Sequence, residues 1–166
     1  MKLIELMLVS LFFAQQGAAV GKVESKFDKT TNFAGLHTYS WTPGSKTEIP
    51  RVGELIVAAC DQEMAKLGFT KVPNGADVTL AFYTVRSTEV DLKALDKLEK
   101  NGGGGPTPTK TLGRLVVVMR SGTGSAPQLW SASTREFVDP DPGRLGDTIH
   151  IVAARLFETY PRAKRP

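Results

Sequence analysis

The order of apolar and polar residues predicts a series of β-strands. From Lys22 to Phe27, Val23, Ser25 and Phe27 share one face, a short strand signal, and from Val78 to Val85 the larger apolar residues Val78, Leu80 and Phe82 likewise share one face. The run from Leu115 to Met119 is apolar throughout and contains three valines, so it predicts a central strand covered on both faces. Strands are expected at residues 22–27, 38–41, 69–72, 78–85, 115–119 and 128–138.

Two longer segments have the spacing of amphipathic helices. Apolar residues recur every three or four positions from Val52 to Leu67, and again from Leu145 to Tyr160. Gly68 follows the first helix at the position where a left-handed residue commonly ends one. For the second helix, Asp141-Pro142 is expected to supply the N-cap and the first helical residue, and Pro161 to end it.

The stretch between the two strongest strands is expected to leave the sheet. Residues 89–100 place apolar side chains among charged ones, which predicts a short surface helix. Gly102 to Gly105, followed by Pro106 and Pro108, predict a flexible loop around residues 101–110. The fold class that follows is α+β: a single domain with a mostly antiparallel sheet and two amphipathic helices packed on one face.

The N-terminal segment has the pattern of a secretory signal peptide. A basic start precedes a nine-residue apolar run, Leu6 to Ala14, and small residues follow at Gly17 to Ala19. The run is too short for a transmembrane helix, which needs about 20 apolar residues. A buried N-terminal helix is the alternative interpretation. We expect residues 1–19 to be the signal peptide, cleavage between Ala19 and Val20, and residues 20–166 to form the mature domain.

Composition agrees with one globular domain and excludes several kinds of protein. The 166 residues are 41% hydrophobic and 23% charged, a balance that supports a buried core. Cys60 is the single cysteine, so no intramolecular disulfide forms, and its place among helical alanines predicts a buried small side chain. The net charge of +4 is spread along the chain, with a basic cluster only at residues 162–165. Nucleic acid is therefore not expected as a partner.

The candidate reactive side chains match no catalytic or metal-binding pattern. The glycines at 102–105 precede prolines and a strand, whereas a phosphate site needs a following helix N-terminus. His150 can reach Asp147, which we interpret as a surface contact. Asp139 and Asp141 alternate with prolines, so turn formation and capping explain them better than cation binding or acid–base chemistry. We predict no catalytic, cofactor-binding or metal-ligating residue and no cofactor.

Three aromatic residues on predicted strands have two interpretations. The three residues are Trp41, Tyr83 and Trp130. The first interpretation is packing in the core, because burying a large aromatic side chain contributes a few kcal/mol, at about 25 cal/mol per Å². The other is an aromatic groove on a sheet face that the helices leave open. If Tyr83 and Trp130 share that face, they form the candidate contact surface for a ligand or partner.

A series of short motifs follows in order along the mature chain. They are Phe27-Asp28, Asn32-Phe33, Thr38-Tyr-Ser-Trp41, Lys66-Leu-Gly68-Phe69, Ala76-Asp77-Val78, Gly113 before Leu115 to Val118, Leu129-Trp130 and Phe157 to Tyr160-Pro161. The series resembles the bacterial family labelled DUF4136 and covers nearly all of the mature chain. The resemblance implies a cell-envelope domain, often a lipoprotein, with no established activity.

Two departures from the family pattern limit what the resemblance implies. No cysteine follows the apolar run, which argues against a lipid anchor. Arg120-Ser121 stands where the family tends to place an Asp-rich turn, which weakens any site there. The family supplies no catalytic residues to transfer to this chain.

These patterns together predict an exported, periplasmic or secreted protein of the cell envelope. We expect a noncatalytic binding or structural module whose partner is an unidentified envelope protein or ligand, without a transmembrane span. The alternative is an exported hydrolase that uses scattered Asp and Ser side chains with His150. A cleft joining His150 to Asp139 or Asp141 and a serine favours the hydrolase, whereas a flat apolar patch or an exposed sheet edge favours the binding module.

Overall fold

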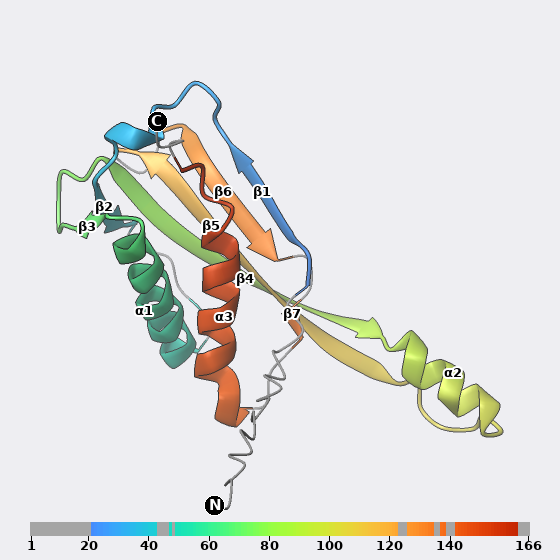
Figure 1. Cartoon of the computed structure of the whole chain (residues 1–166). Helices are drawn as coiled ribbons and strands as arrows, with labels where there is room; N and C mark the ends of the chain where they lie inside the picture. Colours follow the sequence, from blue (N-terminus) through green and yellow to red (C-terminus); the bar gives the residue numbers. More distant parts are fainter. Residues whose placement is uncertain are drawn as a thin grey trace, which may run out of the picture.

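The fold is built around one β-sheet (Figure 1). The computed structural model describes residues 21–42, 47, 49–122, 126–134, 137–138 and 142–162, with the backbone alone at 137, 138 and 142. The strands are β1 (Val23–Phe27), β2 (Thr38–Trp41), β3 (Thr70–Lys71), β4 (Val78–Val90), β5 (Thr109–Ser121), β6 (Gln128–Thr134) and β7 (Phe137–Val138). The helices are α1 (Pro50–Lys66), α2 (Leu92–Lys100) and α3 (Leu145–Phe157), with 3₁₀ turns η1 (Phe33–Gly35) and η2 (Pro142–Arg144).

The sheet is mixed but mostly antiparallel, which confirms the predicted α+β class. Its strand order is β1-β6-β5-β4-β2-β3, and β7 pairs with β5 beside this path. Only β2 pairs in parallel, with β3 and with β4, among the strands that the structure describes. The long β4–β5 hairpin forms the centre, from Val78 opposite Ser121 to Val90 opposite Thr109.

The hydrophobic core lies between the sheet and the two helices α1 and α3. These helices pack side by side on one face of the sheet, as the sequence predicts (Figure 1). Because side chains alternate along a strand, every second residue points into this layer in the parts of β4, β5 and β6 that lie beneath the helices. Leu80, Met119 and Trp130 are register partners across the three strands and are fully buried beneath the helices.

The end of α1 follows the glycine signal in the sequence. Gly68 adopts a φ of +88°, in the left-handed region. Its backbone N–H donates to the carbonyl of Ala65, and the N–H of Phe69 donates to the carbonyl of Met64. These two bonds form a Schellman motif, which satisfies carbonyls that the helix itself leaves unpaired. The turn sends the chain directly into β3.

Two predicted boundaries near the C-terminus are wrong. Pro142 begins the 3₁₀ turn η2, and α3 starts only at Leu145 with Arg144 at its N-cap and no side-chain capping bond. Proline suits the first residue of a 3₁₀ turn as well as that of an α-helix, because both need a φ near −60°. The expected strand over 128–138 is divided into β6 and β7. Asp141 lies outside the described residues.

β4 and β5 extend beyond the sheet as a projecting ribbon with α2 at its end (Figure 1). β4 continues past the predicted end at Val85 to Val90, and α2 begins at Leu92 rather than at Glu89. We call residues 85–114 the arm. β7 pairs with β5 at Leu112 and Gly113, so the outer part of the arm consists of two strands alone in the described structure.

The tip of the arm is shaped by local capping. The carboxylate of Asp91 accepts hydrogen bonds of 3.1 Å from the backbone N–H groups of Lys93 and Ala94. At the other end, Gly102 and Gly103 donate to the carbonyls of Glu99 and Leu98, a second Schellman motif. The glycines therefore end α2 and return the chain towards β5. The predicted flexibility of the loop around 101–110 stays a prediction, and Thr109 and Lys110 already belong to β5.

Candidate functional site

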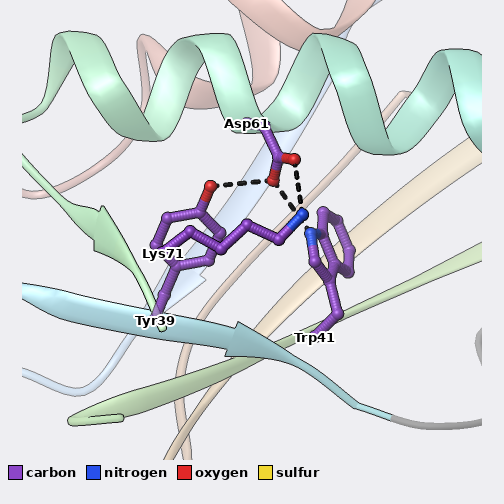
Figure 2. A network of polar contacts seen from close by, with 4 residues as sticks. All are labelled: Tyr39, Trp41, Asp61 and Lys71. Atoms are coloured by element: carbon purple, nitrogen blue, oxygen red, sulfur yellow. Dashed lines mark hydrogen bonds and ion pairs between the residues drawn. The ribbon is translucent and has the colours of Figure 1, made fainter. Parts of the chain in front are cut away.

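A polar network centred on Asp61 joins α1 to the strands β2 and β3 (Figure 2). Asp61 Oδ1 accepts hydrogen bonds from Tyr39 Oη at 2.8 Å and from Trp41 Nε1 at 2.9 Å. Asp61 Oδ2 forms an ion pair of 2.8 Å with Lys71 Nζ. One carboxylate thus holds the ends of two aromatic side chains and a lysine.

The strand period explains how this network forms. Tyr39 and Trp41 are two residues apart on β2, so both point towards the helix layer. Their rings pack in the core while their polar atoms reach Asp61 on α1. From the sequence, Asp61 is placed only on the polar side of its helix. The Tyr-x-Trp pair of β2 was the available signal, since buried tyrosine and tryptophan need a partner for their polar atoms.

The chemistry of the network favours structural support. Burial, together with the hydrogen bond to Asp61, raises the pKa of Tyr39 well above its ordinary value. The phenol therefore remains a protonated donor at neutral pH. Both oxygens of the Asp61 carboxylate have donors, two on Oδ1 and one on Oδ2. We interpret the network as the contact that fixes α1 on the sheet.

A second carboxylate fixes the start of β2 beside β4. Asp77 Oδ2 accepts hydrogen bonds of 2.9 Å from the backbone N–H groups of His37 and Thr38. In return, the hydroxyl of Thr38 accepts a 2.9 Å bond from the Asp77 backbone N–H. These bonds to the charged form hold the pKa of Asp77 below its ordinary value. The Ala-Asp-Val motif therefore sets the parallel pairing of β2 with β4.

Cys60 is buried, as predicted. It lies in α1 with no exposed surface and belongs to the hydrophobic core. Burial raises the pKa of its thiol to about 12, with smaller contributions from Asp61 and Glu63. The thiolate is the reactive form of cysteine, so this side chain is not poised for nucleophilic chemistry at neutral pH.

Of the acidic residues considered beside His150 for a catalytic or metal site, the structure describes only Asp147. His150 lies half-buried on α3, and no hydrogen bond or ion pair links it to Asp147 in the described part of the chain. Asp139 and Asp141 lie outside the described residues, as do Ala19 and Val20 at the expected cleavage point. His37 contributes its backbone N–H to the Asp77 contact.

Tyr83 and Trp130 lie on opposite faces of the sheet, so the groove that would unite them does not form. Trp130 is fully buried and packs its ring against Phe157 and Tyr160, at centroid distances of 5.2 and 5.8 Å. Tyr83 follows the core residue Phe82 on β4 and is therefore directed away from the helices. Its side chain is 51% exposed.

The arm and the strand that leads into it concentrate exposed apolar side chains. Seven large hydrophobic residues are exposed in the described structure, and four of them follow one another along β4 and the start of α2. Soluble proteins expose single apolar residues everywhere, but a local concentration marks a contact surface. The four are Tyr83 at 51%, Val85 at 53%, Val90 at 43% and Leu92 at 71%. Only Tyr83 among them was a candidate from the sequence.

The outer part of the arm also exposes strand edges. Residues 87–90 of β4 have no strand partner on the side away from β5, within the described ranges. Among the strands that the structure describes, residues 109–111 of β5 pair with β4 alone. A two-stranded ribbon is marginally stable in water, and its free edges are templates for a further strand. The arm is therefore the candidate functional site.

Two other kinds of site are absent from the described residues. No group of three or more His, Cys, Asp or Glu side chains there is arranged to hold a metal ion. Among the helices described, none combines the length and apolar character needed to cross a bilayer.

The fold and the arm define a class: an α+β domain with two helices on one face of its sheet and a projecting β4–β5 hairpin. The model of the DUF4136 family, a domain of unknown function, matches residues 23–162. The chain belongs to this family. The match extends from β1 to the end of α3 and therefore includes the arm. No curated protein sequence matches the chain.

The chain is similar to solved structures at low sequence identity. A PDZ domain protein from Parabacteroides distasonis has a TM-score of 0.58 and 13% identity over 88% of this chain. This chain spans only 36% of the length of that protein. Two PelC dodecamer structures from Paraburkholderia phytofirmans give TM-scores of 0.48 and 0.46 at 13% and 14% identity, over 82% of this chain and 96% of theirs. At 13% identity, the similarity to the PDZ domain protein concerns the fold alone.

Proposed function

We propose that this protein is an exported, noncatalytic binding module of the cell envelope and that the arm is its contact surface. The observation that carries the proposal is a set of four exposed large apolar residues on β4 and the start of α2: Tyr83 just before the arm, and Val85, Val90 and Leu92 within it. Large apolar side chains that are exposed close together, at the base of a projecting element and along it, are stabilised by a partner that removes them from water.

The construction of the domain supports the same role. The hydrophobic core between the sheet and the helices α1 and α3 contains no side chain from the tip of the arm. The tip is nevertheless shaped by its own caps, Asp91 at the start of α2 and Gly102 at its end. A segment that is shaped locally and contributes nothing to the core is available for contact with another molecule.

The export component of the proposal rests on the N-terminal sequence. The apolar run from Leu6 to Ala14 and the small residues before Val20 have the order of a signal peptide. Sequencing the N-terminus of the protein from producing cells tests this component. A mature chain that begins at Val20 supports it, and a chain that retains Met1 in the cytoplasm contradicts it.

Site-specific crosslinking tests the contact surface. A photoreactive amino acid is placed at Val85, and a matched control carries it at Ile49, which is 49% exposed but lies before α1. In intact cells we expect a single adduct of defined mass from position 85 and none from position 49. The added substitution Val90→Asp, at an exposed position of the same strand, should reduce the yield of the adduct.

The contrary results are equally defined. Equal adducts from Val85 and Ile49, or none from either, would contradict the arm as the contact surface. Turnover of a generic ester or glycoside by the purified protein, abolished by His150→Ala, would contradict the noncatalytic assignment and support the hydrolase instead.

A further inference from the structure

We propose that the arm binds the arm of a second copy of this chain, with the outer edge of β4 adding to the outer edge of β5 in antiparallel orientation. The inference rests on the proposed function, because it names the partner of the same surface. Residues 87–90 and 109–111 are the two edges that meet.

The chain carries both halves of a complementary pair of edges. Within one molecule, Glu89 of β4 lies directly opposite Lys110 of β5, and Thr88 lies opposite Thr111. Each of these four side chains is exposed. Glu89 and Lys110 form no ion pair with each other in the described structure, so both charges remain available to a neighbour. Opposite charges and paired threonines are favourable cross-strand partners.

Adding β4 of one copy to β5 of the next repeats this internal register between molecules. Glu89 then meets Lys110 of the second copy, Thr88 meets its Thr111, and Val90 meets its Thr109. Both arms point the same way, because β4 runs towards the tip and β5 runs away from it. The added strand pairs the backbone groups that the edge leaves open, which is the mode of β-augmentation.

Charge selects this arrangement over two-fold pairing of identical strands. In a two-fold antiparallel pair, side chains on the same face must match, so paired positions differ by an even number of residues. On β4 this places Glu89 opposite Val85, Ser87 or another Glu89, and never opposite Arg86. On β5 it places Lys110 opposite Leu112 or another Lys110. Only the β4–β5 combination brings opposite charges together at these edges.

The consequence is a head-to-tail assembly. An interface formed by two different surfaces leaves one free edge on each molecule, so association continues until a ring closes or a filament grows. The pairing also places exposed residues such as Val90 beside a neighbouring strand. Association of the protein should therefore increase with concentration.

Charge reversal in separate molecules tests the proposal. Two variants of the full chain, Glu89→Lys and Lys110→Glu, are compared with wild type by sedimentation velocity over a range of concentrations. Wild type is expected to associate. Each variant alone places like charges across the interface, and its dissociation constant should rise about tenfold, the effect of turning an attractive cross-strand pair into a repulsive one.

An equimolar mixture of the two variants separates intermolecular from internal pairing. In the mixture, the lysine introduced at position 89 of one variant meets the glutamate introduced at position 110 of the other. The unchanged Glu89 of the second variant likewise meets the unchanged Lys110 of the first. Association should therefore return towards the wild-type level. The pair within each molecule stays like-charged in the mixture, so recovery cannot come from repair of the arm itself.

Each outcome decides a different statement. A monomeric wild type, or a mixture no more associated than the separate variants, overturns self-association through these edges. If position 85 still gives a crosslinked adduct in cells, and its mass is not that of two copies of this chain, the proposed binding function stands without self-association. If position 85 gives no adduct and the mixture shows no recovery of association, both proposals are overturned.

Discussion

The hydroxyl of Tyr39 on β2 donates a 2.8 Å hydrogen bond to the carboxylate of Asp61 on α1. Tyr160, in contrast, buries its hydroxyl without a hydrogen-bond partner in the described structure, and burial raises its pKa to about 12. Tyr39→Phe should lower the free energy of unfolding by about 1.5–3 kcal/mol, the range for a bond to a charged group. Tyr160→Phe removes no bond and should stay within about 0.5 kcal/mol of wild type or exceed it. Urea unfolding of both variants measures the difference, and equal losses would contradict it.

Gly68 needs the left-handed conformation that ends α1, and nothing lies within 4 Å of the Cβ position. Gly68→Ala should therefore destabilise the protein by about 1–2 kcal/mol through backbone strain alone. Gly68→Asn is the matched control, because asparagine tolerates this conformation better and should cost less. Thermal unfolding compares the two variants, and an equal or larger loss for Asn would show that the strain argument is wrong.

Cys60 should resist thiol reagents in the folded protein. The side chain is fully buried and its pKa is raised to about 12, so reaction requires opening of the structure around α1. We expect labelling at neutral pH to be more than about 100-fold slower in buffer than in denaturant, given the free energy of such opening. Absorbance of the released chromophore from a disulfide reagent measures both rates. Rapid labelling of the native protein would contradict the burial of Cys60 in α1.

Acid should reduce the contribution of Asp77 to stability. Its pKa in the folded state lies below the ordinary value of 3.8, because backbone N–H groups bond to the charged form. Asp77 therefore contributes its full stabilisation at pH values above the pKa of its carboxyl in the unfolded chain. This stabilisation is lost as the pH falls through the pKa of the same carboxyl in the folded protein. The difference in unfolding free energy between wild type and Asp77→Asn should be larger at neutral pH than in acid. Asp28, whose pKa is also lowered, titrates in both proteins and cancels from the difference. A difference that does not change with pH would contradict the prediction.

The layered part of the fold was predictable because burial leaves a pattern in the sequence. The predicted strand over 38–41 has the bounds of β2, and the helical spacing from Val52 to Leu67 lies within α1 and its cap. Gly68 ends that helix as its position indicates. In α1 one face is buried and the other exposed, and in β2 Tyr39 and Trp41 share the side that packs in the core, so the residues record the period of the element.

The arm was not predictable in the same way. Residues 86–90 are exposed on both faces, so no alternation of apolar and polar residues marks their continuation of β4. The relative faces of Tyr83 and Trp130 depend on the register between strands, which periodicity within one strand does not contain. The partners of Asp61 come from β2 and β3, far from it in sequence, and only the tertiary fold brings them together.

Shortening the arm tests the central claim most directly. Residues 88–111 are replaced by an Asn-Gly turn, which keeps Leu112 and Gly113 for their pairing with β7. The core lies outside the removed segment, so the midpoint of urea unfolding should remain close to that of wild type. The crosslink from position 85 should be lost in the same protein. A shortened protein that still forms the same adduct at the wild-type yield would contradict the arm as the contact surface.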